Sequence, residues 1–366
     1  MPDKIVNILQ ADNVHIEGAD GVELSQMSEK LDQVIRDIPD MINSTIALAF
    51  SRYASFEPDE PSYKPIAPVS LKSKREKSIS VGDIVMSHWE IIRCIGKGSL
   101  STVYEAHHTD HGSSYRSAIK VIHSSLRYSP IVGNKDIDTT TVNGAYMIQN
   151  ELNHMMEFKG TGYIVDYEDH ETITNPDGSQ DVIVRMELLE PLSSILRSKT
   201  LSRGEVIRVG IDICKALEFL DRSGLVHRDV KPSNIFLTKW GGYKLGDFSA
   251  ATRLGDQQEI DQIGTLRFMA PEVYSGKPFS SNIDTYSLGI VLYELLNGNR
   301  MPFEPRHPSP EDRESALHQR YSGTPLLEIP GVDKPLQAVV LRACAFKPED
   351  RFSSPTEMLN ELLRLT

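Results

Sequence analysis

The stretch LVHRDVKPSN, residues 225–234, places a histidine, an arginine, an aspartate, a lysine and an asparagine within ten positions. It follows the stretch RGEVIRVGIDICKALEFLDRSG, residues 203–224, in which apolar residues recur at helical spacing. An acid, a base and an amide this close together, directly after an amphipathic segment, indicate a chemical site.

Length and composition narrow the class of protein. The chain has 366 residues, 39% of them hydrophobic and 25% charged, which is ordinary for a soluble globular protein with two or three compact units. The net charge of −12 argues against an extended nucleic-acid surface. No apolar run approaches the roughly 20 residues of a membrane span, and no secretory signal is recognisable. Because Cys94, Cys214 and Cys344 lack metal-type spacing and suit reduced thiols, we expect a cytoplasmic protein.

The beginning of the chain divides into two segments of different composition. Residues 1–54 start with short alternating runs that predict small strands and continue, from Met27 to Ile46, at helical spacing. Residues 55–82 carry prolines and the basic run KSKREK, which predicts a linker. About fifty residues with one amphipathic helix bury too little surface to be stable alone. We therefore expect residues 1–54 to act in regulation or oligomerisation, through self-association or a sensor partner.

From residue 83 onward, strand-like runs come first and helical patterns follow. The strand-like runs are residues 89–96, 101–108, 114–122 and 181–189. The clearest helical patterns are residues 203–224, 285–298 and 355–365. This order predicts an α+β unit, with a strand-rich N-lobe over residues 83–188 and a helical C-lobe over residues 189–366.

A second stretch with chemistry in it is IGKGSLSTVYEA, residues 95–106, which has the spacing G-x-G-x-x-S-x-V. A dinucleotide fold would continue from these glycines into a helix, whereas STVYEAHH is strand-like, and the G-x-x-x-x-G-K-[ST] phosphate loop does not fit either. Two interpretations remain open. The stretch is a glycine hairpin whose backbone lies close to phosphate groups, or it is a plain tight hairpin.

A lysine and a second aspartate strengthen the first interpretation. Lys120 lies in the apolar run SAIKVI, where an unpaired ammonium would be costly to bury, so a partner is implied. Glu151, in the helical pattern MIQNELNHMMEF, is a suitable carboxylate. Asp247 lies in KLGDFSAA. The ammonium can meet phosphate oxygens beyond the glycine hairpin as a compact cation.

In this order, these stretches resemble the protein kinase family across residues 83–366. The matching pieces are GKGSLSTV, AIK, Glu151, HRDVKPSN, DFS, MAPE, DTYSLG and Arg351. Their combination is far more specific than any one of them. The resemblance implies the bilobal protein kinase fold, with ATP as phosphoryl donor and Mg²⁺ or Mn²⁺ as metal.

The resemblance also implies a role for each polar residue of LVHRDVKPSN and DFS. Asp229 would accept or orient the proton of the acceptor hydroxyl, and Lys231 would stabilise the transferring γ-phosphoryl group. Asn234 and Asp247 would hold the metal. An acid, a cation and a metal-binding amide must converge on one phosphate, because phosphoryl transfer depends on positioning and charge neutralisation.

On the nucleotide, Lys120 would grip the α- and β-phosphates and be fixed by Glu151. Since Lys120 and Asp229 are expected in the cleft and not in the core, we expect Lys120→Met and Asp229→Asn to abolish transfer with little effect on melting temperature. The other residues that would surround ATP come from the glycine hairpin, the strand after it, and the gatekeeper and hinge between the lobes: Gly96, Lys97, Gly98, Ser101, Val103, Ala118, Met186, Glu187, Leu188 and Leu189.

Three further charged residues correspond to structural parts of the family. Glu272 and Arg351 would form a buried ion pair, and Asp284 would support the backbone around His227 and Arg228. These roles would be structural and not catalytic.

The family resemblance also implies the substrate class. The sequence KPS after Asp229, with Gly264 and Thr265 ahead of MAPE, resembles serine/threonine kinases, and the C-terminal stretches resemble soluble bacterial members of the eukaryotic-like group. We therefore expect protein serine or threonine as acceptor. One alternative is a pseudokinase that only binds nucleotide or partners, whose hallmark would be the loss of Lys120, Asp229 or Asp247. Another is a small-molecule kinase, against which the MAPE element argues.

Three features of the sequence differ from the usual pattern of the family. Ser249 replaces the usual glycine of DFG, and serine has a narrower φ range. Residues 128–144 form an insertion between Lys120 and Glu151. The segment after Asp247 offers Glu259 and Asp261 where a phosphate would meet Arg228, which predicts appreciable basal activity without phosphorylation of this segment. The alternative is that these acids are only solvated and that Thr265 is autophosphorylated.

Other features have plainer interpretations that we prefer. The histidines of HHTDH, residues 107–111, have metal-like spacing, but they fall where a solvated turn between strands is expected. KSKREK more simply keeps a linker extended than binds acidic lipid or nucleic acid. Cys94 is expected to be packed and not reactive.

Overall fold

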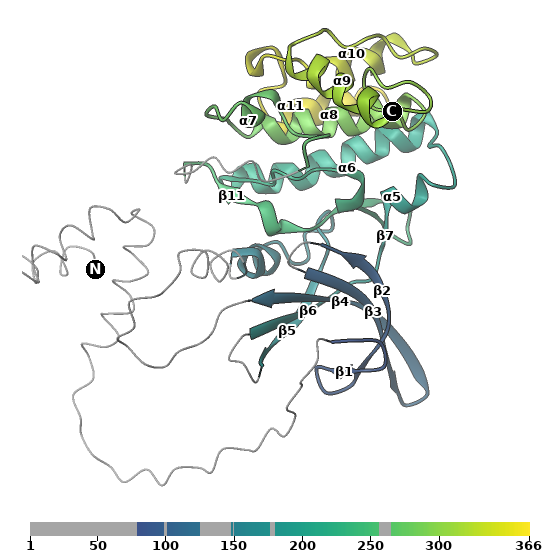
Figure 1. Cartoon of the computed structure of the whole chain (residues 1–366), viewed down its shortest axis with the longest axis vertical. Helices are drawn as coiled ribbons and strands as arrows, with labels where there is room; N and C mark the ends of the chain where they lie inside the picture. The colour runs from purple at the N-terminus through teal and green to yellow at the C-terminus, as the bar shows by residue number, and fades with distance from the viewer. Residues whose placement is uncertain (1–78, 99–100, 125–147, 149, 176–179, 256–264) are drawn as a thin grey trace, which may run out of the picture. The chain divides into compact units, whose positions relative to one another are not determined.

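The computed structural model describes residues 79–98, 101–124, 148, 150–175, 180–255 and 265–366. Within this part of the chain, a strand-rich lobe precedes a helical lobe, as the sequence predicts (Figure 1). The small segment predicted for residues 1–54 lies outside the described residues. Residues 55–78 of the predicted linker also lie outside them.

The described part of the N-lobe consists of one antiparallel sheet and a helical stretch over residues 150–157. Its strands, in hydrogen-bonded order, are β1 (Ile84–Val85), β2 (Trp89–Lys97), β3 (Ser101–Asp110), β4 (Ser113–Ser124), β6 (Gln180–Met186) and β5 (Tyr167–Thr174). In this register Lys120 lies opposite Val103 on one side and Val184 on the other. Ile119 and Val121, which alternate with Lys120, are fully buried in a core on the other face. The alternation therefore turns the lysine toward the face that meets the C-lobe.

The packed lobe begins before the predicted boundary at residue 83. Ile79 is 4% exposed and belongs to the same core as Ile91. Its carbonyl accepts a hydrogen bond of 2.9 Å from the hydroxyl of Tyr104. Residues 79–82 therefore belong to the strand-rich lobe and not to the linker. Proline and charge content marked the segment as a linker, but one apolar side chain and one carbonyl have partners in the sheet.

Helices dominate the C-lobe, and four of them begin at a side-chain cap. The helices are α5 (Leu192–Ile195), α6 (Arg203–Arg222), α7 (Pro271–Tyr274), α8 (Asn282–Leu296), α9 (Pro310–Tyr321), α10 (Lys334–Ala343) and α11 (Pro355–Leu363). Ser202 and Glu205 form a capping box at the start of α6, and Ser309 and Asp312 do the same for α9. Nearly every residue of α8 is buried, so it is the central helix of the lobe.

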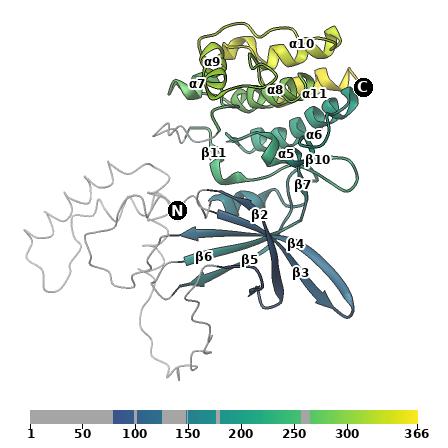
Figure 2. The ribbon, with the colours of Figure 1, turned by 45° about the vertical axis from the view of Figure 1, so that its right-hand side comes forward.

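Short strands position the polar residues. β8 (Leu225–Val226), β9 (Ile235–Leu237) and β10 (Tyr243–Leu245) flank residues 227–234 and Asp247, and β7 (Glu190–Pro191) and β11 (Thr252–Arg253) pair with β9 and β8. Figure 2 shows β7 and α5 between the sheet and the longer helices. Residues 163–165, counted with the N-lobe from the sequence, bond to the C-lobe. The amide of Leu245 donates to the carbonyl of Tyr163, and the amide of Val165 donates to that of Leu245, both at 2.9 Å.

Candidate active site

Lys120 joins a helix of the N-lobe to the segment that carries Asp247. Its ammonium donates to Glu151 at 2.5 Å, from a helical stretch over residues 150–157, and to Asp247 at 2.8 Å. Burial alone would lower the pKa of Lys120, but the two carboxylates outweigh it and raise the pKa. The predicted Lys120–Glu151 pair is therefore confirmed, whereas the insertion over residues 128–144 lies outside the described residues.

Asp247 is held as a carboxylate in a constrained turn. Its backbone is left-handed, with a φ of 63°. Burial would raise the pKa of Asp247, but the Lys120 ammonium and a hydrogen bond from Ser249 lower it to about 2. Ser249 lies in the 3₁₀ turn Phe248–Ala250 without a left-handed φ. Serine can adopt this conformation, so the departure from glycine does not strain the turn.

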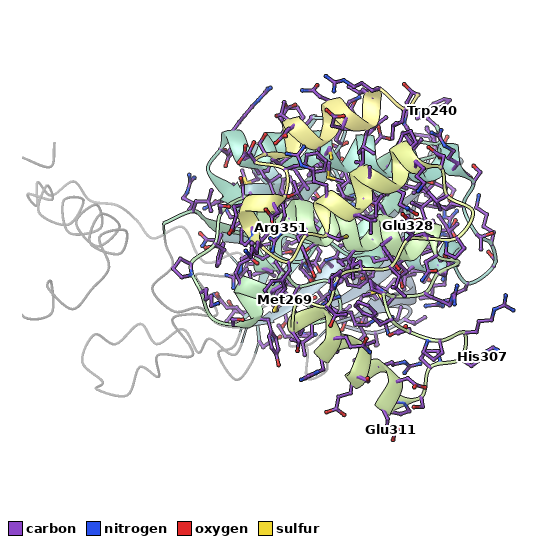
Figure 3. All side chains as sticks on the ribbon, turned by 90° about the horizontal axis from the view of Figure 1, so that it is seen from above. Trp240, Met269, His307, Glu311, Glu328 and Arg351 are labelled. Atoms are coloured by element: carbon purple, nitrogen blue, oxygen red, sulfur yellow. The ribbon has the colours of Figure 1, made fainter. Side chains whose placement is uncertain are left out.

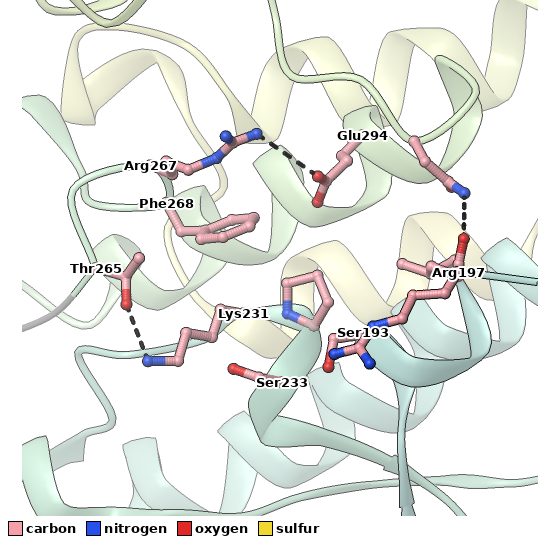
Figure 4. Close-up of a pocket in the computed structure, with 11 residues that line it drawn as sticks. Ser193, Arg197, Lys231, Ser233, Thr265, Arg267, Phe268 and Glu294 are labelled. Atoms are coloured by element: carbon pink, nitrogen blue, oxygen red, sulfur yellow. Dashed lines mark hydrogen bonds and ion pairs between the residues drawn. The ribbon is translucent and has the colours of Figure 1, made fainter. Parts of the chain in front are cut away.

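The carboxylate of Asp229 is surrounded by donors from two segments. One oxygen accepts bonds from the ammonium of Lys231 at 2.5 Å and from the side-chain amide of Asn234 at 3.1 Å. The other accepts bonds from Thr265, through its hydroxyl at 3.0 Å and its backbone amide at 3.1 Å. Lys231 also donates to the Thr265 hydroxyl at 2.9 Å, and Figure 4 shows these two side chains facing each other.

The loop that carries Asp229 is fixed from behind by a buried acid. Asp284, 3% exposed in the first turn of α8, accepts the backbone amides of His227 at 2.6 Å and Arg228 at 2.9 Å. Arg228 has a φ of 68°, and the two hydrogen bonds to Asp284 hold this left-handed backbone. The prediction for Asp284 is confirmed. The predicted partners of Arg228, Glu259 and Asp261, lie outside the described residues.

His227 connects the two catalytic segments. Its Nε2 lies 3.1 Å from the carbonyl of Gly246, so this nitrogen carries the proton, and its Nδ1 accepts the backbone amide of Asp229 at 3.3 Å. A neutral ring with the proton on Nε2 satisfies both bonds. Gly246 precedes Asp247, so the ring bridges the loop of Asp229 and the turn of Asp247.

The glycine hairpin lies between β2 and β3. The amide of Gly98 donates to the carbonyl of Ser101 at 2.8 Å, and Lys97 is exposed at the end of β2. Among described atoms, a Cβ on Gly96 would meet only Val103, at 3.7 Å, and one on Gly98 only Ser101, at 3.4 Å. These are ordinary contacts, and neither glycine has a left-handed φ. No steric contact within the described residues requires glycine at these two positions. This fits a surface on which the missing side chains leave room for a ligand.

Comparison with known proteins agrees with this geometry. Residues 89–363 match the protein kinase domain family. The chain belongs to the protein kinase family. The predicted ion pair of that fold is present too, because the guanidinium of Arg351 donates to the two carboxylate oxygens of Glu272 at 2.6 and 2.7 Å.

Several bacterial protein kinases are similar in sequence to this chain. One is the serine/threonine-protein kinase Pkn1 of Myxococcus xanthus, 31% identical over 75% of this chain and 38% of that protein. Another is the serine/threonine-protein kinase PknB of Mycobacterium leprae, 35% identical over 44% of this chain and 26% of that protein. The probable serine/threonine-protein kinase PknB of Corynebacterium glutamicum is 28% identical over 77% of this chain and 43% of that protein. The chain thus spans less than half the length of these relatives.

The predicted adenine surface is assembled from adjacent strands. Ala118 lies opposite Met186 in the sheet, and Val103 lies opposite Lys120. The hydroxyl of Ser117 donates to the carbonyl of Met186 at 2.8 Å, which fixes the end of β6 just before the hinge. Leu188 and Leu189 follow outside the strand and are half-buried, like Val103 and Met186. Contact of these residues with a nucleotide stays a prediction.

Lys244 is a residue of the kinase site that sequence reasoning missed. It is 8% exposed in β10, donates to Asp166 at 2.7 Å and also bonds Glu187. The backbone amide of Glu187 in turn donates to the carbonyl of Asp166 at 3.1 Å. The side chain and the backbone amide of Glu187 are therefore both committed to partners within the protein. The signal was a lysine within the buried run YKL, the same signal that singled out Lys120.

A pocket of about 440 Å³ opens beside Lys231 (Figure 4). It is lined by Ser193, Leu196, Arg197, Lys231, Pro232, Ser233, Thr265, Arg267, Phe268, Glu294 and Asn299. Burial raises the pKa of Glu294 from 4.5 to about 7, against the influence of Arg267. Lys231 and Thr265 both line the pocket and contact Asp229, so the pocket adjoins that aspartate.

The prediction that Cys94 is packed is wrong, because Cys94 lies at an exposed position of β2. The solvated turn predicted for HHTDH is confirmed only at His111, because residues 107–110 form the end of β3. No group of three metal-ligating side chains occurs among the described residues. No helix in the described part of the kinase is long and apolar enough to cross a membrane. The cytoplasmic location stays a prediction.

Proposed function

We propose that this kinase transfers the γ-phosphoryl group of ATP to serine and threonine hydroxyls of proteins. The observation that carries the proposal is the carboxylate of Asp229, which contacts Lys231, Asn234 and Thr265 within 3.1 Å. Three relatives with serine/threonine kinase names support the acceptor class. The pseudokinase alternative has no support, because Lys120, Asp229 and Asp247 are all present and hydrogen-bonded.

In this proposal Asp229 takes the acceptor proton or orients the hydroxyl, since its oxygens are fixed by donors on both sides. Lys231 lies within reach of the same carboxylate and of Thr265, so its ammonium is held next to the reacting oxygen. There it offsets the negative charge that spreads over the transferred group. Lys120, held by Glu151, supplies a second cation for the phosphates that remain on the donor.

Asp247 and Asn234 fit a hard divalent cation such as Mg²⁺ or Mn²⁺. Asp247 is ionised at neutral pH because its pKa is lowered to about 2. The amide nitrogen of Asn234 donates to the backbone carbonyl and the carboxylate of Asp229, which leaves its oxygen as the ligand atom. When bound, the metal would neutralise phosphate charge. The protein's own part is to present the two oxygen ligands on the ordered turns after β8 and β10.

The acceptor is proposed to be a protein and not a small molecule. The pocket beside Lys231 is open and is lined by segments 193–197, 231–233 and 265–268, which offer an extended surface. We also propose that residues 1–54 bring two copies of the chain, or a sensor partner, together. A segment of this length buries too little apolar surface to be stable without a partner.

The test is transfer of labelled phosphate from γ-labelled ATP with Mg²⁺ to myelin basic protein, followed by analysis of the labelled amino acids. We expect label on serine or threonine, and a loss of more than about a hundredfold with Asp229→Asn. Asp110→Asn, at the exposed β3–β4 turn, is the matched control and should keep full activity. Label that survives Asp229→Asn, or label confined to tyrosine, would contradict the proposal.

A further inference from the structure

Arg320, in the last turn of α9, is a buried cation with no carboxylate partner among the described residues. Its exposed fraction is 4%. Burying a charge is costly unless other groups replace its hydration. What surrounds this guanidinium therefore shows which part of the molecule depends on it.

The partners of Arg320 are backbone carbonyls of one short segment. Nη1 donates to the carbonyl of Arg267, and Nη2 donates to that of Leu266 at 2.7 Å and to that of Met269 at 3.5 Å. Three carbonyls from four consecutive residues thus turn toward one planar cation. Arginine suits this task because its fork presents several donors in fixed directions, which the single ammonium of lysine does not.

Tyr321, the next residue, contacts the same carbonyls. Its hydroxyl donates to Leu266 at 2.6 Å and accepts a bond from Arg320 at 3.0 Å. Its ring stacks on that of Tyr274 in α7, with centroids 4.0 Å apart and planes 4° apart. Figure 3 shows Glu311, at the start of α9, at the rim of the lobe, and Met269 farther in. The last turn of α9 is therefore the part of the helix that meets the segment.

Residues 265–269, called the docking segment below, form the acceptor side of the site. Thr265 bonds to both Asp229 and Lys231, and Arg267 and Phe268 line the pocket beside Lys231. In the described part of the chain, the ion pairs of Lys120 are with Glu151 and Asp247 and none involves α9. A change in the docking segment should therefore alter how a protein acceptor binds more than how ATP binds.

We propose that Arg320 and Tyr321 are positioning residues that hold the docking segment in the shape that accepts a protein substrate. The inference rests on the proposed function. It assigns to the last turn of α9 a role in acceptor affinity, acting through the carbonyls of residues 266, 267 and 269. Neither side chain touches the reacting atoms.

The test compares Arg320→Lys and Tyr321→Phe with Arg313→Lys, a matched control on the exposed face of the same helix. KM is measured for myelin basic protein at saturating ATP, and for ATP at saturating acceptor. We expect Tyr321→Phe, which loses one hydroxyl, to raise the acceptor KM about fivefold, and Arg320→Lys to raise it more. The KM for ATP should stay within about twofold of wild type, and Arg313→Lys should change neither constant.

Two outcomes would overturn the proposal. One is an unchanged acceptor KM in a folded Tyr321→Phe chain, and the other is an equal rise in both KM values, which would indicate a general structural defect. If Arg320→Lys fails to fold, Tyr321→Phe still decides.

A second readout needs no catalysis. The amides of Phe268 and Met269 donate to the carbonyl of Thr265, so their hydrogen exchange reports the shape of the docking segment. We expect faster exchange in Tyr321→Phe and Arg320→Lys than in Arg313→Lys, and equal exchange would overturn the proposal. Absence of phosphate transfer in the wild type would instead contradict the proposed function and leave this readout to decide the positioning role.

Discussion

Lys120 is the residue whose burial most changes the expected effect of a mutation. From the sequence, Lys120→Met should remove activity with little effect on melting temperature. The structure changes the expected effect on stability, because Lys120 is 6% exposed and Glu151, its partner, is 4% exposed. Removing one member of a buried pair leaves the other charge uncompensated, which costs about 3–5 kcal/mol.

We therefore predict that Lys120→Met lowers the melting temperature by roughly 10 °C, at about 2–4 °C per kcal/mol for a domain of this size. Adding Glu151→Gln to Lys120→Met removes the more deeply buried of the two stranded carboxylates, since the Asp247 side chain is 36% exposed and can be solvated. The double variant should therefore regain most of the loss, while both chains stay inactive. Differential scanning calorimetry of the wild type, the single variant and the double variant measures the effect. Equal melting temperatures for the single and double variants would show that the pair does not stabilise the fold.

Asp229→Asn is expected to affect stability less than Lys120→Met. Asn keeps the shape of the side chain, and the charge that loses its partner is the Lys231 ammonium, whose side chain is 22% exposed and can be solvated. For this residue the expectation of a small stability change stands. The contrast between the two residues was invisible in the sequence, because both lie in polar motifs and only packing distinguishes them.

At the scale of an element, α8 carries a carboxylate whose titration changes stability. Glu294 faces Arg267 at 4.0 Å, and burial raises the pKa of its carboxyl from 4.5 to about 7. Between these values the unfolded chain has lost the proton and the folded chain keeps it. The folded state then binds more protons, so the contribution of Glu294 to stability falls as the pH rises from about 4.5 to about 7 and stays low above that.

The variant Glu294→Gln tests this. At pH 5 the variant and the wild type should have similar stability, whereas at pH 8 the variant should be more stable, by at most about 3 kcal/mol. Urea unfolding at several pH values measures the difference, with Glu311→Gln, exposed in the first turn of α9, as the control. A difference that does not grow with pH would contradict the predicted titration.

The strands and helices were largely predictable, because the burial of one face of a strand or helix makes apolar residues recur at a fixed spacing in the sequence. The alternation of Ile119, Lys120 and Val121 indicated β4, and the helical spacing over residues 203–224 indicated α6. Contacts that depend on distant segments were not predictable. Nothing around Arg320 reveals that its partners are carbonyls fifty residues earlier in the chain.

At the scale of the whole molecule, order and spacing of motifs identified the candidate site. The pairs Lys120–Glu151 and Glu272–Arg351 and the support from Asp284 were expected from the family resemblance, and all are present. The exact start of the packed lobe was not predictable. It depends on Ile79, a single apolar residue between polar ones, whose burial arises only from the finished sheet.

The role of residues 1–54 is a prediction at this scale as well. A shortened chain of residues 76–366 keeps Ile79 and therefore the core of the strand-rich lobe. We expect the full chain to show a larger mass than one copy in light scattering and the shortened chain to be monomeric. Monomeric masses for both would exclude self-association and leave a sensor partner as the remaining proposal.

The placement of one ammonium between two carboxylates, Glu151 and Asp247, has a thermodynamic consequence. This cluster carries one positive and two negative charges. When the ammonium binds a polyphosphate, it neutralises less of the negative charge of Asp247. A divalent cation at Asp247 replaces that lost neutralisation, so nucleotide and metal should bind with positive heterotropic cooperativity. Reciprocity then requires that the factor by which the metal tightens ATP binding equals the factor by which ATP tightens metal binding.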